Sequence, residues 1–358
     1  MALNYLYYRV QVKYMSYDVS VIIPCYNSED TISRCIDSVI NQSLGFENIE
    51  LILFDDVSKD NTRKIMLDYA TKYENIVTIF SENNVGPGIG RNKCIEVASA
   101  NYIMCLDSDD VYCKDMCQTL YETITVENAD IVSCNYYNVD SIRTYKEHYT
   151  CSADFEYKES MKIYDEFNST FFGDILVWNK IFKKSLIVDN NIKFPNDFED
   201  WIFSTKAFLH CEKLIYLEDY FGVKKHFYEH SLSHKTSKEC IRYIEVLFEV
   251  NELIMTKCSD RDLIKKNKLS DIKDSIIKAI VILSDLNWND NFKGAFNRVY
   301  GYESYFSINE SLDNRFFDII NFFIRKRQVK ITFIILKIIN FLKGLTFLRI
   351  IYNYIRTS

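Results

Sequence analysis

Short apolar runs alternate with helix-like patterns over the first third of the chain. Val19–Ile23 is apolar except for Ser20, and comparable runs follow at Leu51–Phe54, Ile76–Phe80 and Tyr102–Leu106. Between the first two runs, apolar residues recur at helical spacing, namely Ile32, Cys35, Ile36, Val39 and Ile40. Strands that alternate with helices indicate βαβ units, so we predict an α/β fold with a mainly parallel, Rossmann-like sheet flanked by helices. Ligands bind such sheets beyond the carboxyl ends of the strands.

The pattern changes farther along the chain. A helix at Lys114–Val126 and a strand at Asp130–Cys134 continue the alternation, and the aromatic, polar stretch from Tyr136 to Phe194 indicates loops. Helical periodicity returns over residues 240–290, and Ile308–Arg315 is the expected hinge before a tail. We therefore predict an extension at residues 1–17, an α/β domain at 18–238 with halves at 18–112 and 113–238, a helical region at 239–314 and a tail at 315–358.

Composition and charge narrow the class of protein. Nine Gly and three Pro in 358 residues argue against a turn-rich all-β fold. The eleven Cys residues are scattered singly, as in reduced intracellular proteins, and residues 1–17 lack the apolar core of a signal peptide. The net charge is −7, yet eight of the 43 basic residues follow Asp318 and no acidic residue does, so the tail suits a partner of negative charge.

Carboxylates follow two of the predicted strands. Asp55 and Asp56 come after the second apolar run, and Asp107, Asp109 and Asp110 come after the fourth. Such groups repel one another, and a hard divalent cation such as Mg²⁺ or Mn²⁺ relieves the repulsion while it bridges phosphate oxygens. Asp110 taken alone could instead cap a following helix. The two clusters together favour a site for a metal ion and a nucleotide diphosphate.

Four sequence blocks resemble the inverting family 2 glycosyltransferases of GT-A fold. They are Val19–Asn27, Asp55–Ser58, Gly90–Asn92 and Asp107–Asp110, in the family's order and spacing. The resemblance covers Asp18–Tyr112 and continues more weakly to about Lys235, and the family usually has Gly in place of Val57 and Ala in place of Gly90. It implies transfer of a sugar from a nucleotide-diphosphate donor, expected to be UDP-linked, to a hydroxyl of a glycan or lipid-linked glycan. Bacterial capsule or lipopolysaccharide assembly is the expected setting.

The resemblance also implies roles for residues of these blocks. Asp56 would accept the N–H of the uracil ring, and Arg91 would face the base or the diphosphate, for which its planar guanidinium is suited. The other donor-binding residues would be Pro24, Tyr26, Asn27, Asp107 and Ser108. Asp107, Asp109 and Asp110 are the candidate metal ligands, and the resemblance leaves open which of the last two touches the ion.

A second pair of acids lies far from these blocks, at Glu199 and Asp200. It resembles the family's Glu-Asp pair, in which Asp200 would be the general base that takes the proton of the acceptor hydroxyl. The flanking Trp201 favours a partly desolvated site, where a carboxylate binds its proton more tightly. On local pattern alone the pair could instead be the charged N-terminus of a helix. The earlier run Trp178, Asn179 and Lys180 also resembles the family and is expected to shape the acceptor side.

The segment 224–238 is rich in Lys and His. By resemblance it would close over the diphosphate through His226, His230 and Ser231, where basic groups screen phosphate charge. Residues 226–230 also match the His-x-x-Glu-His pattern of some zinc peptidases, but no long helix with a downstream Glu ligand accompanies them.

Other classes of protein fit less well. The run Gly86–Gly90 is not placed between the first strand and its helix, as a dinucleotide-binding loop would be, and we interpret it as a flexible donor-site loop. A sugar-nucleotide nucleotidyltransferase would need a Gly-rich, basic loop after the first strand, where this chain has Cys25–Glu29. A non-catalytic carbohydrate-binding relative would not need both metal ligands and a base. We expect no nucleic-acid partner.

The tail is predicted to lie on a membrane without crossing it. Its uncharged stretches between Ile319 and Ser358 are far shorter than the ~20 residues that span a bilayer. It nevertheless combines an apolar surface with Lys326, Lys330 and Lys337 on one helical face, as a helix in the headgroup region does. The alternatives are packing on the enzyme's own acidic body or a dimer contact. We therefore expect a cytoplasmic protein held on the inner face of the plasma membrane.

Overall fold

The computed structural model describes residues 6–8, 16–139, 144–147, 157–158, 161–164, 176–196 and 199–226 in the first part of the chain. Later it describes 326–343 and a few shorter stretches, at 246, 249–250, 252–253, 293–294, 296–297, 299–300, 322 and 324. The chain forms two compact units, Met1–Ser231 and Leu232–Ser358.

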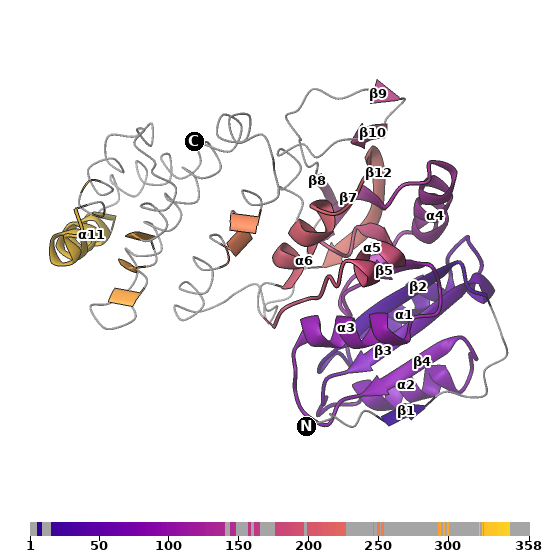
Figure 1. The fold of residues 1–358 in the computed structure, drawn as a ribbon. Coiled ribbons are helices and arrows are strands. Elements are labelled where there is room, and N and C mark those ends of the chain that lie inside the picture. Colours follow the sequence, from indigo (N-terminus) through magenta and orange to yellow (C-terminus); the bar gives the residue numbers. More distant parts are fainter. Residues whose placement is uncertain are drawn as a thin grey trace. The chain divides into compact units, whose positions relative to one another are not determined.

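The first unit is built on one mixed sheet (Figure 1). The strand order is β1-β4-β3-β2-β5-β11-β7-β12-β10-β9. Strands β2 (Val19–Cys25), β3 (Ile49–Asp55), β4 (Ile76–Phe80) and β5 (Tyr102–Cys105) are parallel to their neighbours among these four. Their bounds match the four predicted apolar runs to within two residues at each end, so the α/β prediction with a mainly parallel sheet is confirmed.

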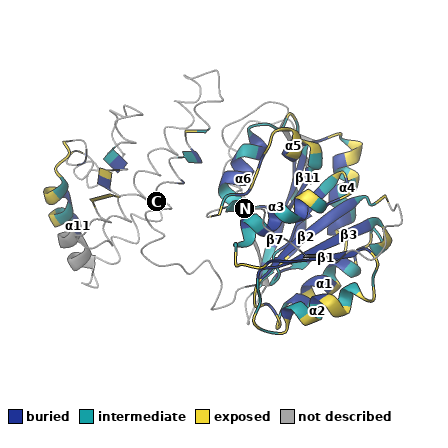
Figure 2. Ribbon diagram, turned by 60° about the horizontal axis from the view of Figure 1, so that its bottom comes forward, coloured by how far each residue is buried: buried dark blue, intermediate teal, exposed yellow. Residues whose placement is uncertain are grey.

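Both faces of this parallel part are covered by helices. Alternate residues of β2 point to opposite cores, with Val21 and Ile23 in one and Ile22 in the other, as the period of two in a strand requires. The first core takes residues from α1 (Ile32–Ile40), α2 (Thr62–Ala70) and α4 (Met116–Val126); the second takes them from α3 (Pro87–Val97), α5 (Lys184–Asp189) and α6 (Glu199–Phe208). Figure 2 shows the sheet buried between helices whose outer faces are exposed. Because helices cover both faces of the sheet, these strands are mainly apolar.

The strand order reverses direction at β2. From β2 the chain moves to β3 and β4 on one side, and then crosses to β5 on the other side of β2. The loops after β2 and β5 therefore separate at the carboxyl end of the sheet and leave a crevice where ligands bind in folds of this type. The fold places the Asp107–Asp110 block at this position.

In the other half of the sheet only the start of β7 was predicted, as a strand at Asp130–Cys134, and the prediction of loops from Tyr136 to Phe194 is wrong, because this stretch supplies further strands. This half contains β11 (Lys180–Lys183), antiparallel to β5, then β7 (Ile131–Val139) and the long strand β12 (Leu214–His226). β12 runs parallel to β7 with irregular register between Leu217 and Val223, and it also pairs with β6 (Val111–Tyr112) and β10 (Met161–Tyr164). Short antiparallel strands complete the sheet, namely β1 (Leu6–Tyr8), β8 (Thr144–Glu147) and β9 (Tyr157–Lys158).

One prediction about a loop is wrong. Residues 87–90, interpreted as a flexible donor-site loop, form the first turn of α3. Pro87 supports the helix because its ring fixes φ at a helical value and a first-turn N–H needs no partner. Gly86, with φ 83°, makes the turn into the helix.

The described part of the second unit is helical where it is continuous. Helix α11 (Val329–Lys343) ends directly before Gly344, and a turn at residues 326–327, in which Arg327 has φ 52°, precedes it. Ile331 and Ile334 are 40% and 56% exposed. Among the described residues, no helix combines the length and the apolar character that a membrane span requires.

Candidate active site

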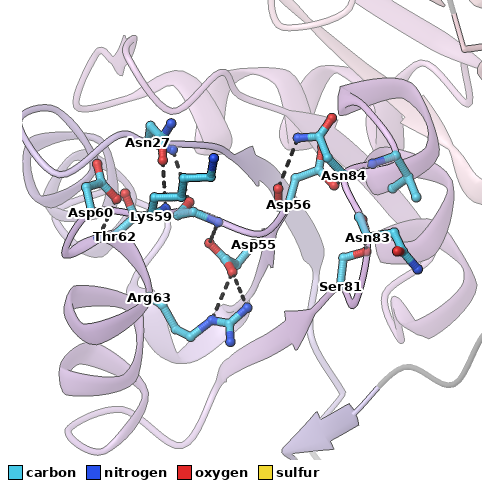
Figure 3. A network of polar contacts seen from close by, with 12 residues as sticks. Asn27, Asp55, Asp56, Lys59, Asp60, Thr62, Arg63, Ser81, Asn83 and Asn84 are labelled. Atoms are coloured by element: carbon cyan, nitrogen blue, oxygen red, sulfur yellow. Dashed lines mark hydrogen bonds and ion pairs between the residues drawn. The ribbon is translucent and has the colours of Figure 1, made fainter.

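The loops after β2 and β3 are joined by hydrogen bonds (Figure 3). The side-chain oxygen of Asn27 accepts the Lys59 N–H at 2.8 Å, and the Asn27 N–H donates to the Ser58 hydroxyl at 3.0 Å. Asn27 has φ 47°, a conformation that Asn tolerates better than most residues. Tyr26, which the sequence places in the donor pocket, is 48% exposed beside this joint, whereas Pro24 is buried inside β2.

The two aspartates that follow β3 have different partners. Asp55 is fully buried and accepts two hydrogen bonds from Arg63, at 2.7 and 3.0 Å. The two residues form an ion pair that stabilises the fold. The Asp56 carboxylate accepts the N–H groups of Val85 and Gly86, at 2.7 and 2.8 Å. Asp56 thus fixes the turn that starts α3. Each carboxylate oxygen has further acceptor capacity, so a role toward a pyrimidine is compatible with these bonds.

Val57 is strained. Its φ is 66°, in the left-handed region where a β-branched side chain is rare. The family resemblance expects Gly here, and this φ supplies the physical reason. The strain is located in the loop between Asp56 and Ser58, at the carboxyl edge of the sheet.

A contact between hydroxyls crosses the crevice. The Ser28 and Ser108 hydroxyls lie 2.8 Å apart and join the loop after β2 to the loop after β5. Ser108 was predicted as a donor-binding residue, but Ser28 was not, because a lone Ser after a strand carries no distinctive signal.

The three aspartates after β5 converge. Asp107, Asp109 and Asp110 each offer a carboxylate oxygen, and these atoms lie within 4.8 Å of one another. Burial and the neighbouring Asp107 raise the pKa of Asp109 to about 6 and hold that of Asp110 well above its usual range. A set of oxygen donors that repel one another matches what Mg²⁺ or Mn²⁺ prefers, so these residues fit a hard divalent cation.

Basic groups surround this carboxylate cluster. The backbone N–H of His226 donates to the Asp110 carboxylate at 2.8 Å, and the Arg34 guanidinium donates to the backbone carbonyl of Asp109 at 2.9 Å. Lys225 lowers the pKa of both Asp109 and Asp110, although burial and Asp107 outweigh it. Burial, followed by the charge of Arg34, lowers the pKa of the His226 imidazole. His226 ends β12 and is not on a helix, which removes the structural context of a zinc peptidase; His230 and Ser231 lie outside the described residues.

Arg91 joins this carboxylate cluster to the predicted base. Its guanidinium is 3% exposed and lies 2.6 Å from Asp107, 3.1 Å from Asp200 and 3.3 Å from Glu199. Burial lowers the pKa of Arg91, but the three carboxylates outweigh this effect and raise it. Burial raises the pKa of Asp200 to about 7, against the opposing charge of Arg91. The predicted metal ligand and the predicted base, distant in sequence, are thus held by one cation.

Asp200 owes its place to the packing of α3 against the start of α6. A Cβ on Gly88 would lie 2.3 Å from the Pro195 carbonyl and 2.9 Å from the Glu199 Cβ, so only Gly fits there. A Cβ on Gly90 would lie 2.7 Å from the Phe54 ring. Both contacts bring α3 closer to its neighbours than an Ala would allow.

The acceptor-side run is inside the protein. Trp178 is 2% exposed and meets Tyr136 edge to face, with 4.7 Å between ring centroids. Asn179 and Lys180 are fully buried, and the Lys180 ammonium donates to the Leu176 carbonyl at 2.6 Å. These three residues can shape a neighbouring surface but offer little of it themselves. Trp201 is half-buried on α6.

A cavity that the sequence did not predict lies beside His226, along β7 and β12. Its volume is about 710 Å³, and Tyr137, Tyr220, Phe221, Lys224 and His226 are among its lining residues. Figure 1 shows the strands that supply it, β7 and β12, side by side. Its residues come from aromatic, polar segments whose strand pairing only the structure reveals.

Comparison with known proteins gives consistent results. The model of the family described as "Glycosyl transferase family 2" matches residues 20–186. The chain is 34% identical over 206 residues to the poly(ribitol-phosphate) beta-glucosyltransferase of Bacillus spizizenii, a match that spans 56% of this chain and 31% of that protein. It is 32% identical over 216 residues to glycosyltransferase GlyG of Streptococcus pneumoniae, spanning 57% of this chain and 69% of that protein.

Solved structures agree on the fold. The crystal structure of S. aureus TarS 1–349 in complex with UDP-GlcNAc superposes with a TM-score of 0.68 at 22% identity, over 88% of this chain and 89% of that one. The order of blocks, the crevice at the strand reversal and the extent of the match to GlyG lead to one conclusion. The chain belongs to glycosyltransferase family 2.

Proposed function

We propose that this protein is an inverting glycosyltransferase that uses a nucleotide-diphosphate sugar, UDP-linked, and a divalent cation. The observation that carries the proposal is the single buried guanidinium of Arg91, which holds both the Asp107 side of the carboxylate cluster and Asp200. A leaving diphosphate and an incoming hydroxyl must occupy opposite sides of one anomeric carbon. The residues that face the diphosphate and the residue that takes the hydroxyl proton must therefore lie close together, as Asp107 and Asp200 do around Arg91.

The chain's own groups would act as follows. Asp107, Asp109 and Asp110 would hold Mn²⁺ or Mg²⁺, which when bound neutralises charge on the leaving diphosphate. Asp200 would take the acceptor hydroxyl proton while the new bond from oxygen to the anomeric carbon forms and the bond to the diphosphate breaks. A pKa of about 7 suits Asp200 for this exchange near neutral pH.

The donor and acceptor classes rest on relatives. TarS has been crystallised with UDP-GlcNAc, which supports a uridine nucleotide as the donor of this chain. Tyr26, Asn27, Asp56 and Ser108 would line the nucleotide pocket. The poly(ribitol-phosphate) glycosyltransferases among the relatives support a polymeric surface glycan, free or lipid-linked, as acceptor.

The experiment is a panel of nucleotide sugars scored for release of the nucleoside diphosphate with and without Mn²⁺. We expect one or a few donors to give metal-dependent release, and Asp109→Ala to abolish both release and Mn²⁺-dependent UDP binding. Unchanged UDP binding in this variant would refute the metal assignment. A product whose anomeric configuration is retained by NMR would refute the single displacement.

We also propose that the tail, residues 315–358, seats the enzyme on the cytoplasmic face of an anionic membrane. Lys326, Arg327 and Lys330 are exposed near the start of α11, and Ile331 and Ile334 are exposed on it. Basic residues near an anionic leaflet contribute about 1 kcal/mol each, and apolar side chains add burial in the headgroup region.

Flotation of the full chain with anionic liposomes tests the membrane proposal. We expect the wild type to float at low salt and the double variant Ile331→Glu/Ile334→Glu to remain in the soluble fraction. Val188→Glu is the matched control, because Val188 is an equally exposed apolar residue on α5. Equal flotation of the double variant, or none by the wild type, would refute the membrane seat.

A further inference from the structure

Asn92 fastens the segment that leads to the predicted base. Its side-chain amide donates to the Phe194 carbonyl at 2.8 Å and its side-chain oxygen accepts the Phe194 N–H at 2.9 Å. One side chain thus satisfies both backbone groups of a residue six positions before Asp200. The pair replaces the ladder bonds that a strand would provide for Phe194.

Phe194 is held from its other sides as well. The Arg91 guanidinium lies 5.4 Å from the centre of its ring, and the Phe203 ring of α6 stacks on it with 3.7 Å between centroids. Phe194 is therefore packed between α3 and α6. The Gly88 contact with the Pro195 carbonyl extends this interface by one residue.

Arg91 adds ion pairs to the contact between α3 and α6. It reaches Glu199 and Asp200 in the first turn of α6 and Asp107 beyond them, while no described residue accepts a hydrogen bond from its Nε. Three carboxylates surround this guanidinium, so its charge is already balanced before any phosphate arrives. This arrangement favours a role in placing α6 over a direct contact with the donor diphosphate.

We propose that Arg91 and Asn92 are positioning residues, which fasten the segment around Phe194 and the start of α6 to α3 and thereby set where the Asp200 carboxylate stands relative to Asp107. The proposal rests on the function proposed above for Asp200. It gives the Gly90–Asn92 block a mechanical role, in which Gly90 lets α3 approach Phe54, Asn92 holds the backbone and Arg91 holds the charges.

The kinetic test is Asn92→Ala in the full-length protein, since Asn92 is not among the residues assigned to the donor, the metal ion or the acceptor. We expect kcat to fall at least tenfold, because a misplaced base slows only the chemical step, and the KM for the donor to change less than twofold. Asn92→Asp keeps the acceptor for the Phe194 N–H and loses the donor, so it should retain intermediate activity. A rise in donor KM with kcat unchanged would overturn the proposal.

Asn75→Ala is the matched control. The Asn75 side chain is likewise buried and donates to two backbone carbonyls, those of Phe46 and Ile49, at the opposite end of the sheet. It should lower the unfolding temperature about as much as Asn92→Ala while leaving kcat unchanged. If both variants lose kcat in proportion to stability, Asn92 is only a structural residue and the proposal fails.

A second test does not depend on activity. In thermal unfolding, Arg91→Gln should cost less stability in an Asp200→Asn background than in the wild type, because the buried carboxylate it leaves unpaired is then neutral. Additive shifts would overturn the proposal that Arg91 fastens the start of α6 to α3. If this coupling is found but the wild type transfers no sugar from any donor, the proposed function fails, while the positioning role of Arg91 stands.

Discussion

At the residue scale, the backbone of Val57 is the clearest departure from what its side chain prefers. A β-branched residue at φ 66° costs roughly 1–2 kcal/mol or more, and Gly avoids this cost at the expense of greater freedom in the unfolded chain. We expect Val57→Gly to raise the free energy of unfolding by about 1 kcal/mol in urea titration. Asn27→Gly is the comparison: it should destabilise, because Asn27 tolerates its φ and its side chain holds Lys59. If Val57→Gly lowers the free energy of unfolding, the inference that the Val57 backbone is strained is wrong.

Asp200 gives a prediction about pH. Its pKa is raised to about 7, so the protonated form is favoured and the base is lost as pH falls through 7. The rate should therefore fall about tenfold per pH unit below this value and level off above it. Asp200→Asn should reduce kcat by roughly 10²–10⁴-fold and leave UDP binding intact. The remaining activity should no longer fall as the pH drops below 7. Loss of UDP binding in the variant would indicate a structural carboxylate instead.

These residues also show what a sequence can reveal about a site. The carboxylates of the Asp107–Asp110 block could be placed together in advance, because they follow a parallel strand at the strand reversal. The partners of Arg91 could not, since Glu199 and Asp200 are more than one hundred positions away and no periodicity reports that distance.

At the scale of elements, the contact between α3 and α6 depends on the absence of a side chain at Gly88. Gly88→Ala should cost about 1–3 kcal/mol, because the new methyl group overlaps the Pro195 carbonyl and the start of α6 must move. We expect kcat to fall together with the unfolding temperature. Gly294→Ala is the control, since its new Cβ would meet no atom of the described residues within 4 Å. Equal effects of the two substitutions would argue against a tight interface.

Elements differ in how well the sequence predicted them. The strands β2 to β5 are buried on both faces, so they are apolar runs with polar ends and were predicted almost to the residue. β12 carries Glu218, Asp219 and two lysines within one irregular strand, and its partners β6, β7 and β10 come from three places in the chain. Its pairing is set by tertiary contacts, which local composition does not encode.

At the scale of the whole molecule, every described residue assigned to donor, metal or base lies in the unit Met1–Ser231. A fragment of residues 1–238 should therefore fold and bind UDP with Mn²⁺ within about threefold of the full chain, by calorimetry. The predicted membrane tail is absent from this fragment, so flotation should be lost while nucleotide binding persists. Loss of UDP binding would show that the second unit completes the donor site.

The contact between Gly90 and Phe54 also restricts the order in which this protein could have changed during evolution. The family usually has Ala where this chain has Gly90, and a methyl group there would collide with the Phe54 ring. An ancestor with Ala could accept Phe at position 54 only after Ala had become Gly. Reversal from the present chain requires the opposite order, with a smaller side chain at position 54 first. The two positions are thus coupled, because change in either direction passes through the same intermediate, with Gly at position 90 and a smaller side chain at position 54.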